Sequence, residues 1–193
     1  LGEVGERLSA VDAFAISVGP GAFTSLRIGL ATVKGLAFGT ERRIAPVSTL
    51  AAVAYPACPG GGAVAALLDA RRGEVYAGLF DASGELPVPI ADEGVETAAT
   101  LAARLPTGAA LLGELPTGLV DDLRAHGRED VTPLLVSAPR VRVLGVVALG
   151  AASLAAGQGV SASALTANYL RRPEAEEKRL AAAGALDTPE KLQ

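Results

Sequence analysis

The sequence predicts an α/β protein built from two lobes, and three observations carry that prediction. The chain has 193 residues, of which 50% are hydrophobic and 20% charged. This composition suffices for one compact domain or two small lobes, and it excludes intrinsic disorder. Apolar runs typical of strands alternate with segments of helical periodicity. Finally, residues 56–62 combine two prolines and three glycines, which marks a boundary between lobes.

The first lobe, residues 1–58, is expected to contain two strands and two helices in alternation. The expected elements are strand Ala13–Val18, helix Thr24–Phe38 ended by Gly39, strand Ile44–Val47, and a helix through Tyr55 capped by Ser48 or Thr49. Such a piece leaves one edge of its sheet unpaired and one face poorly covered. Because the sequence also begins with Leu1 and contains no Met, we expect that about 50 residues precede it. We therefore expect this lobe to be poorly stable by itself.

The second lobe, residues 63–168, follows a Pro/Gly linker at 59–62 and opens with an antiparallel meander. Its strands are Ala63–Asp69, Val75–Asp81 after a turn at Arg71-Arg72-Gly73, and Leu86–Ile90. Helices near 96–105, 118–126 and 141–156 then alternate with strands near 109–113 and 131–136. Residues 169–193 form a charged, Ala-rich tail that we expect to be a loop and a loose helix.

One stretch, residues 143–170, contains no charged side chain. Its apolar part is only about 15 residues long, whereas a membrane span needs about 20. We therefore expect a buried core helix here and no membrane association.

The loop Gly19-Pro20-Gly21 follows a strand and opens a helix, a context in which backbone N–H groups can hold an anion. It lacks the Gly-Lys-Ser/Thr of a phosphate loop and the third glycine of a dinucleotide fingerprint, where Thr24 stands. Two interpretations remain open. The loop is either a tight turn with Thr24 as the helix cap, or a nucleotide or anion contact formed by Gly19, Gly21 and Thr24.

The helix after this loop has two unlike faces. A core stripe is formed by Leu26, Leu30, Val33 and Ala37. The opposite face is small and uncharged, and it consists of Ile28, Ala31, Thr32 and Gly35, with Arg27 and Lys34 on a flank. Glycine in mid-helix costs about 1 kcal/mol relative to alanine, but it allows another helix to approach closely. We expect this face to pack on a helix, either one of this protein's own or one of a partner.

The remaining candidates for chemistry are few. Asp69 and Glu74 flank the arginine turn and form either a carboxylate pair or the solvated ends of a hairpin. His126 is expected to close a helix, and Cys58 lies in the linker region. With one His and one Cys in the sequence, we expect no metal site and no Cys–His nucleophile. The formal net charge of −4 argues against a protein that holds nucleic acid mainly through phosphates.

Three segments together resemble one protein family. They are AISVGPGAFTSLRIGLATVKGLAFG at 15–39, LLDARRGEVYAGLF at 67–80 and NYLRRPEAEEK at 168–178, and VSTLAAVA at 47–54 fits as well. The chain is identified on these motifs as similar to the TsaB family, also called YeaZ. The resemblance implies the actin/hsp70-like (ASKHA) fold of two ribonuclease-H-like lobes, here with an incomplete first lobe.

The resemblance also implies a function. TsaB proteins are cytoplasmic, non-catalytic subunits of the bacterial complex that attaches N6-threonylcarbamoyl to adenosine 37 of tRNAs reading ANN codons. The family pairs with a catalytic paralogue, TsaD, which holds the metal and nucleotide, and with an ATPase, TsaE. This chain is thus expected to bind no cofactor itself, although the complex uses ATP and a metal in the partner. The helix bearing Arg27, Ile28, Ala31, Thr32, Lys34 and Gly35 belongs to the heterodimer interface in that family. Contact with tRNA is expected mainly through the complex.

The sequence departs from the family pattern at Ala22 and Ser25, where Ser and Gly are usual, and it lacks the family's opening Asp-Thr-Ser strand and first helix. Ala22 weakens the anion-binding interpretation because it removes a hydroxyl from the loop. Two alternatives to the scaffold hypothesis remain. One is a nucleotide-binding enzyme of the same fold, kinase-like or peptidase-like, and the other is a homodimer formed through the same helix face.

Overall fold

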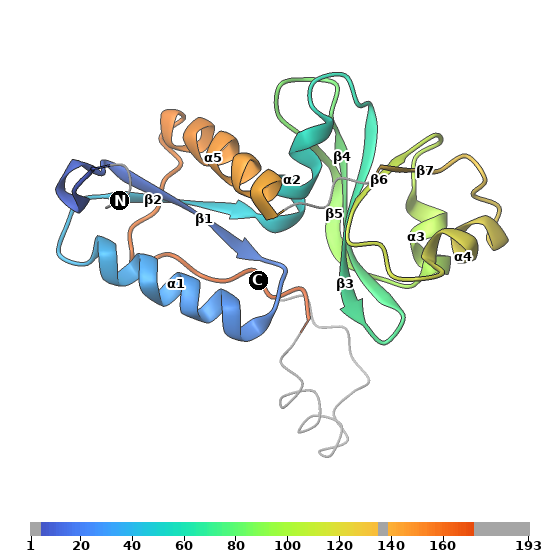
Figure 1. The fold of residues 1–193 in the computed structure, drawn as a ribbon, viewed down its shortest axis with the longest axis horizontal. Helices are drawn as coiled ribbons and strands as arrows, with labels where there is room; N and C mark the ends of the chain where they lie inside the picture. The colour runs from blue at the N-terminus through green and yellow to red at the C-terminus, as the bar shows by residue number, and fades with distance from the viewer. Residues whose placement is uncertain (1–4, 135–138, 172–193) are drawn as a thin grey trace, which may run out of the picture.

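The computed structural model describes residues 5–134 and 139–171, and it contains two sheets (Figure 1). The first-lobe sheet has two parallel strands, β1 (Ala13–Gly19) and β2 (Arg43–Ser48), joined by α1 (Phe23–Ala37). The second-lobe sheet has the strand order β5-β4-β3-β6-β7. Its strands are β3 (Ala63–Arg71), β4 (Glu74–Asp81), β5 (Val88–Glu96), β6 (Ala110–Gly113) and β7 (Thr132–Leu134). The other helices are α2 (Thr49–Ala54), α3 (Ala98–Arg104), α4 (Leu119–Ala125) and α5 (Pro139–Ala155), with 3-10 turns η2 (Leu8–Ala10) and η3 (Tyr55–Ala57).

The first-lobe sheet is sandwiched between α1 on one face and α5 on the other (Figure 1). On the α1 side, Leu30 and Ala37 are buried with Ile44 of β2. After β2, Ser48, one of the two predicted caps, caps α2, since its hydroxyl accepts hydrogen bonds from the N–H groups of Leu50 and Ala51.

In the second lobe, β3, β4 and β5 form the predicted antiparallel meander, and β6 and β7 add in parallel to the β3 edge. Both faces of β3 are buried. Ala65 and Leu67 face α3 and α4, whereas Ala66 and Leu68 face α2. Helix α2 therefore lies between the two sheets and joins the lobes (Figure 1).

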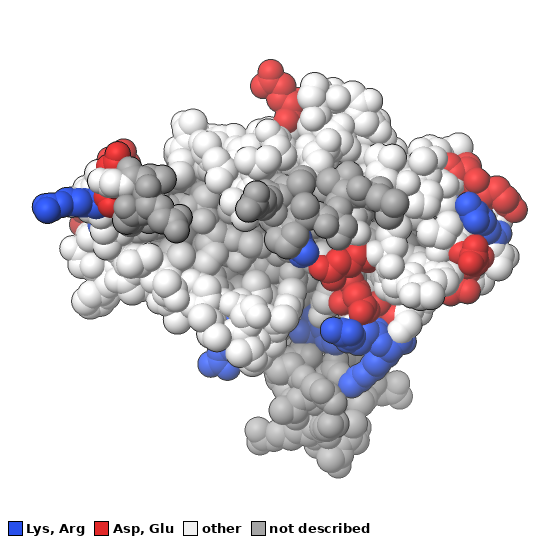
Figure 2. All heavy atoms as spheres, in the orientation of Figure 1, with Lys and Arg blue, Asp and Glu red and all other residues white. Residues whose placement is uncertain are grey.

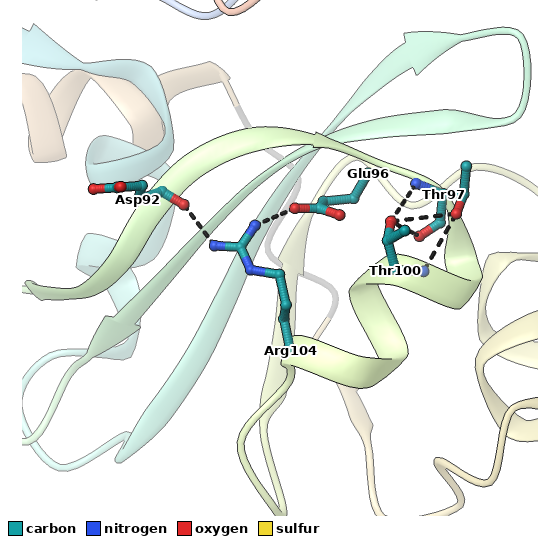
Figure 3. A network of polar contacts seen from close by, with 5 residues as sticks. All are labelled: Asp92, Glu96, Thr97, Thr100 and Arg104. Atoms are coloured by element: carbon teal, nitrogen blue, oxygen red, sulfur yellow. Dashed lines mark hydrogen bonds and ion pairs between the residues drawn. The ribbon is translucent and has the colours of Figure 1, made fainter. Parts of the chain in front are cut away.

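The third meander strand, predicted near Leu86–Ile90, is longer than predicted. The structure puts β5 at Val88–Glu96, so the two overlap at residues 88–90, and residue 96 is strand, not helix. Helix α3 starts later because Thr97 and Thr100 form a reciprocal capping box (Figure 3). Glu96, which is only 8% exposed, forms an ion pair with Arg104, and Arg104 also donates to the carbonyl oxygen of Asp92 at 2.7 Å (Figure 3). This network holds α3 against the outer strand of the sheet.

The helix predicted near residues 141–156 is present, but the expectation of a buried core helix was wrong in part. Helix α5 follows the second-lobe strands in sequence, but it packs on the first-lobe sheet and on α2. Two glycines, Gly145 and Gly150, lie on its inner face. A Cβ at Gly145 would collide with the backbone of Ala52, and one at Gly150 would collide with Ala15. Its outer face leaves Val143, Leu144 and Val147 more than half exposed.

Within the described ranges, none of the helices has both the length and the apolar character that a membrane crossing requires. The expected loose helix of the tail, apart from residues 169–171, and the end of the strand predicted at 131–136 lie outside those ranges.

Candidate functional site

The outer face of α1 is exposed as the helical periodicity predicts. Ile28 is 63% exposed, and Ala31, Thr32 and Gly35 are also exposed. Apart from the adjoining backbone of α1 itself, no described atom lies within 4 Å of the position that a Cβ on Gly35 would occupy. Just beyond the helix, Phe38 is 84% exposed. This uncharged face is open to solvent along the length of the helix, as the white surface over α1 in Figure 2 indicates.

The flanks and core stripe of α1 also follow the prediction. Arg27 is exposed and its guanidinium lies 5.1 Å from the centre of the Phe23 ring. Lys34, on the same flank, is half-buried. Leu30 and Ala37 are buried, while the other two predicted core residues, Leu26 and Val33, are half-buried.

The helix cap was predicted wrongly. Residue 22, not Thr24, is the N-cap, because Ala22 has extended backbone angles and its carbonyl accepts the first helical hydrogen bond from Leu26 at 3.0 Å. Thr24 lies exposed in the first turn. Gly19 has a structural explanation, since its φ is +124° and a Cβ there would collide with the carbonyl oxygen of Asn168.

A cleft of about 620 Å³ lies between the lobes. It is lined by the glycine loop and the start of α1 on one side and by the end of β3 on the other. Of the three predicted loop residues, Gly21 lines this cleft, while Gly19 and Thr24 do not. Its polar groups include a hydroxyl pair, Ser17 and Thr49 at 2.5 Å, and an ion pair, Arg142 and Glu114 at 3.0 Å.

The hairpin between β3 and β4 forms one wall of the cleft. Gly73 has φ +76°, as the hairpin interpretation requires. The two carboxylates here engage different arginines. Asp69 accepts the N–H of Arg71 at 2.7 Å and pairs with its guanidinium at 3.4 Å, whereas Glu74 pairs with Arg171.

A polar junction joins three separate segments of the chain. The Ser48 hydroxyl donates to Glu93 on β5, and the Asn168 amide donates to the other carboxylate oxygen of Glu93 at 3.3 Å. The Asn168 N–H also donates to the carbonyl of Val18 at 2.8 Å. Burial raises the pKa of Glu93, and its hydrogen bonds from Ser48 and Asn168 oppose that shift. These contacts connect both sheets to the C-terminal segment.

The two isolated candidates occupy structural positions. His126 is the C-cap of α4, and its N–H donates to the carbonyl of Asp122 at 3.1 Å, which confirms the helix-closing prediction. Cys58 is half-buried, and burial followed by the charge of Asp81 raises the pKa of its thiol. Among the residues the structure describes, no group of three or more His, Cys, Asp or Glu side chains is arranged to hold a metal ion.

Comparison with known proteins identifies the family. A solved structure from Pseudomonas aeruginosa, described as an uncharacterized protein with similarity to peptidase YEAZ, superimposes with a TM-score of 0.73 at 32% identity. The match covers 88% of this chain and 78% of that one, and a second structure, YeaZ from Pseudomonas aeruginosa, gives a TM-score of 0.71 at the same identity and coverage. The chain belongs to the TsaB/YeaZ family. This confirms the actin/hsp70-like α/β fold class.

Sequence comparison agrees with this membership. The family model described as TsaD, tRNA N6-adenosine threonylcarbamoyltransferase, matches residues 1–112 of this TsaB-family chain. The tRNA threonylcarbamoyladenosine biosynthesis protein TsaB of Escherichia coli K12 is 46% identical over 74 residues, which is 37% of this chain and 32% of that protein. Its Haemophilus influenzae counterpart is 44% identical over 78 residues, or 39% and 33% of the two chains. The matched stretches therefore span about a third of the length of these curated relatives.

In this TsaB-family chain, sequence reasoning missed the residues that connect distant segments. Glu93, Asn168 and Arg171 carry the contacts between the lobes and the C-terminal segment, yet none was singled out as a candidate. Asn168 and Arg171 lie in a motif that served only to indicate the family. No local pattern marks Glu93, because it lies in the part of β5 beyond Ile90, where the predicted strand ended.

Proposed function

We propose that this TsaB-family chain is a non-catalytic dimerisation subunit that takes part in threonylcarbamoylation of adenosine 37 in tRNAs reading ANN codons. Its partner would be a TsaD-like catalytic subunit, docked on the outer face of α1. Two findings support the proposal. Curated relatives are named as tRNA threonylcarbamoyladenosine biosynthesis proteins, and the α1 face is exposed, uncharged and small.

The exposed face of α1 is the observation that carries the proposal. Exposed helix surfaces normally bear charged residues, whereas this one offers Ile28 and Phe38 beside Ala31 and Gly35. Small side chains let two helices approach closely, so that ridges on a partner helix can enter the groove over Gly35. Arg27 at the edge provides a cation for an acidic group at the rim of such an interface.

The proposal extends to the rest of the assembly. A TsaE-like ATPase would join the pair, the metal and ATP would be used on the partner and not on this chain, and the assembly would work in the cytoplasm. Without its partner, the chain would form a homodimer through the same α1 face, because an exposed apolar patch is self-complementary across a two-fold axis.

The test is co-purification of this chain with a TsaD-like protein, read by size-exclusion chromatography with light scattering. We expect a one-to-one complex with the wild-type chain. Gly35→Glu places a charged side chain on the face, at a position whose Cβ meets none of the described atoms outside the adjoining helix backbone. Since Gly is a poor helix former, this substitution should leave the helix as stable as before or more so. Loss of the complex together with an unchanged or raised melting temperature would locate the contact on α1.

Ala103→Glu is the matched control, because Ala103 is also an exposed helical residue and lies on α3. It should leave the complex intact. If neither wild type nor control forms a complex, the dimerisation proposal is wrong. Saturable binding of MgATP by this chain would then favour the nucleotide-binding alternative, for which the cleft beside Gly21 is the candidate site.

A further inference from the structure

The turn between β3 and β4 places two adjacent arginines in an unusual backbone conformation. Arg71 has φ 66° and Arg72 has φ 56°. This left-handed region is open to glycine at no steric cost and to asparagine at little, but it is unfavourable for residues with a long side chain. Arg71 on β3 lies opposite Glu74 on β4 in the strand register, so Arg72 and Gly73 form the two-residue tip of the hairpin. Such tips prefer Asn-Gly, which makes the arginine at position 72 a departure from the residue the backbone favours.

The turn is braced from both sides. The Asp69 carboxylate accepts the N–H of Arg71 at 2.7 Å, and the Arg171 guanidinium donates to the carbonyl of Ala70 at 2.5 Å and pairs with Glu74. Arg171 is largely buried, so it acts as a support and not as an exposed cation. In contrast, the Arg71 side chain is 85% exposed, and Arg72 is exposed as well. The backbone of the turn is therefore held by hydrogen bonds, while the side chains of Arg71 and Arg72 are exposed.

The turn brings two adjacent arginines together in a chain whose formal net charge is −4. The Arg71 guanidinium pairs with Asp69 of the same hairpin at 3.4 Å. In the region where Figure 1 places the β3–β4 hairpin, Figure 2 shows basic side chains with acidic side chains directly above them. The exposed ion pair of Arg71 with Asp69 is weak and can open for a stronger anion.

The turn also lies close to the start of α1. Tyr169 packs on Phe23 with ring centres 5.3 Å apart, and two residues later Arg171 reaches the hairpin. Phe23 and Arg71 line the same cleft. A partner docked along α1 would therefore have the arginine turn beside it, on the side to which α1 is exposed (Figure 1).

We propose that the Arg71-Arg72 turn binds phosphate groups of the tRNA backbone while the tRNA is held by the assembly, an inference that rests on the proposed function. Guanidinium groups suit this task because they stay charged and can form two parallel hydrogen bonds to one phosphate. The contact would carry no sequence information. It would position the tRNA on the complex, and base recognition would occur elsewhere.

The test measures binding of a fluorescein-labelled, unmodified tRNA reading an ANN codon by fluorescence anisotropy, at several salt concentrations. The sample is this chain paired with its TsaD-like partner. The variant carries Arg71→Gly and Arg72→Gly, since glycine fits both backbone positions. We expect roughly tenfold weaker binding, and a slope of log affinity against log salt reduced by about 0.7–0.9 for each phosphate that the variant no longer neutralises. A variant with Arg71→Lys and Arg72→Lys should retain most of the slope.

Arg124→Ala is the matched control. Arg124 pairs with Asp121 at 3.4 Å, the same separation as in the Arg71–Asp69 pair, but it lies on α4. It should leave both affinity and slope unchanged. If the glycine variant binds tRNA like wild type while still pairing with the partner, the inference is wrong and the proposed function stands. If the chain and its TsaD-like partner form no complex, the same salt titration of tRNA binding is carried out with the chain alone. Equal affinity and slope for wild type and the glycine variant would then overturn the inference.

Discussion

The two sheets of this protein are buried to very different degrees. Strand β1 is half-buried along most of its length, has one neighbouring strand and leaves its other edge unpaired within the described residues. Strand β3 lies inside a five-stranded sheet and is buried on both faces. Among the described residues, the cluster under α1 contains five buried members, whereas the two clusters on the faces of the second sheet contain thirteen and nine.

This difference in burial indicates that one lobe provides most of the stability and the other is suited to interaction. Apolar burial is the main source of folding free energy, so the second sheet should be the stable part of the molecule. The first lobe carries the exposed apolar surfaces of α1 and α5, which are suited to contact with other surfaces. Regions used for interaction are commonly drawn from the less stable parts of a fold.

The largest expected effect compares one core leucine in each lobe. Leu67→Ala on β3 should destabilise the chain by about 3–5 kcal/mol, because Leu67 is fully buried between the sheet and α3 and α4, where neighbours have little room to move. Leu30→Ala on α1 should cost about 2–3 kcal/mol, since the smaller cluster can relax around it. Urea unfolding followed by circular dichroism measures both. Equal losses of unfolding free energy in the two variants would contradict the expected difference in packing between the lobes.

The sequence predicted best where local pattern decides the structure. The apolar run at Ala63–Asp69 was sufficient to locate β3, and the Ser48-Thr49 pair narrowed the cap of α2 to two residues, of which the structure shows Ser48. The third meander strand was predicted too short because β5 includes Pro89, Asp92 and Glu93, which obscure the alternation.

Local sequence patterns could not predict the contacts that connect the lobes. Glu93 and Asn168 are 75 residues apart, and Glu74 and Arg171 are 97 apart, so no local spacing can pair them. The exposed face of α1, by contrast, follows from helical periodicity within fifteen residues. The candidate interface was therefore predictable, while the polar junction and the braced arginine turn needed the fold.

A smaller effect tests whether polar contacts add to the stability of the second lobe. Arg104→Ala removes the partner of nearly buried Glu96 and should cost about 1–3 kcal/mol, because an almost desolvated carboxylate is left without its donor. Arg124→Ala breaks an exposed pair in the same lobe and should cost less than about 0.5 kcal/mol. Thermal melts of both variants measure the difference. Similar losses of stability in the two variants would show that burial of Glu96 does not increase the stabilisation provided by its ion pair.

The smallest effect concerns Glu93, the group that joins the two lobes. Its folded-state pKa is raised above the ordinary value of 4.5 by burial, so the folded protein binds a proton more tightly than the unfolded chain. Stability from this group is therefore present below about pH 4.5 and is lost as pH rises through the folded pKa. Glu93→Gln removes the charge while keeping polar atoms near Ser48 and Asn168. The variant should match wild type in acid and exceed it in stability near pH 7.

Urea unfolding midpoints of wild type and Glu93→Gln, taken at about pH 4 and pH 7, measure this pH-dependent gap. Glu85→Gln on the exposed segment before β5 is the control and should show no gap at either pH. If Glu93→Gln is less stable than wild type by the same amount at both pH values, this expectation is wrong. The hydrogen bonds that Glu93 accepts from Ser48 and Asn168 would then outweigh the cost of burying its charge. The junction would contribute to holding the weaker lobe on the stronger one at neutral pH.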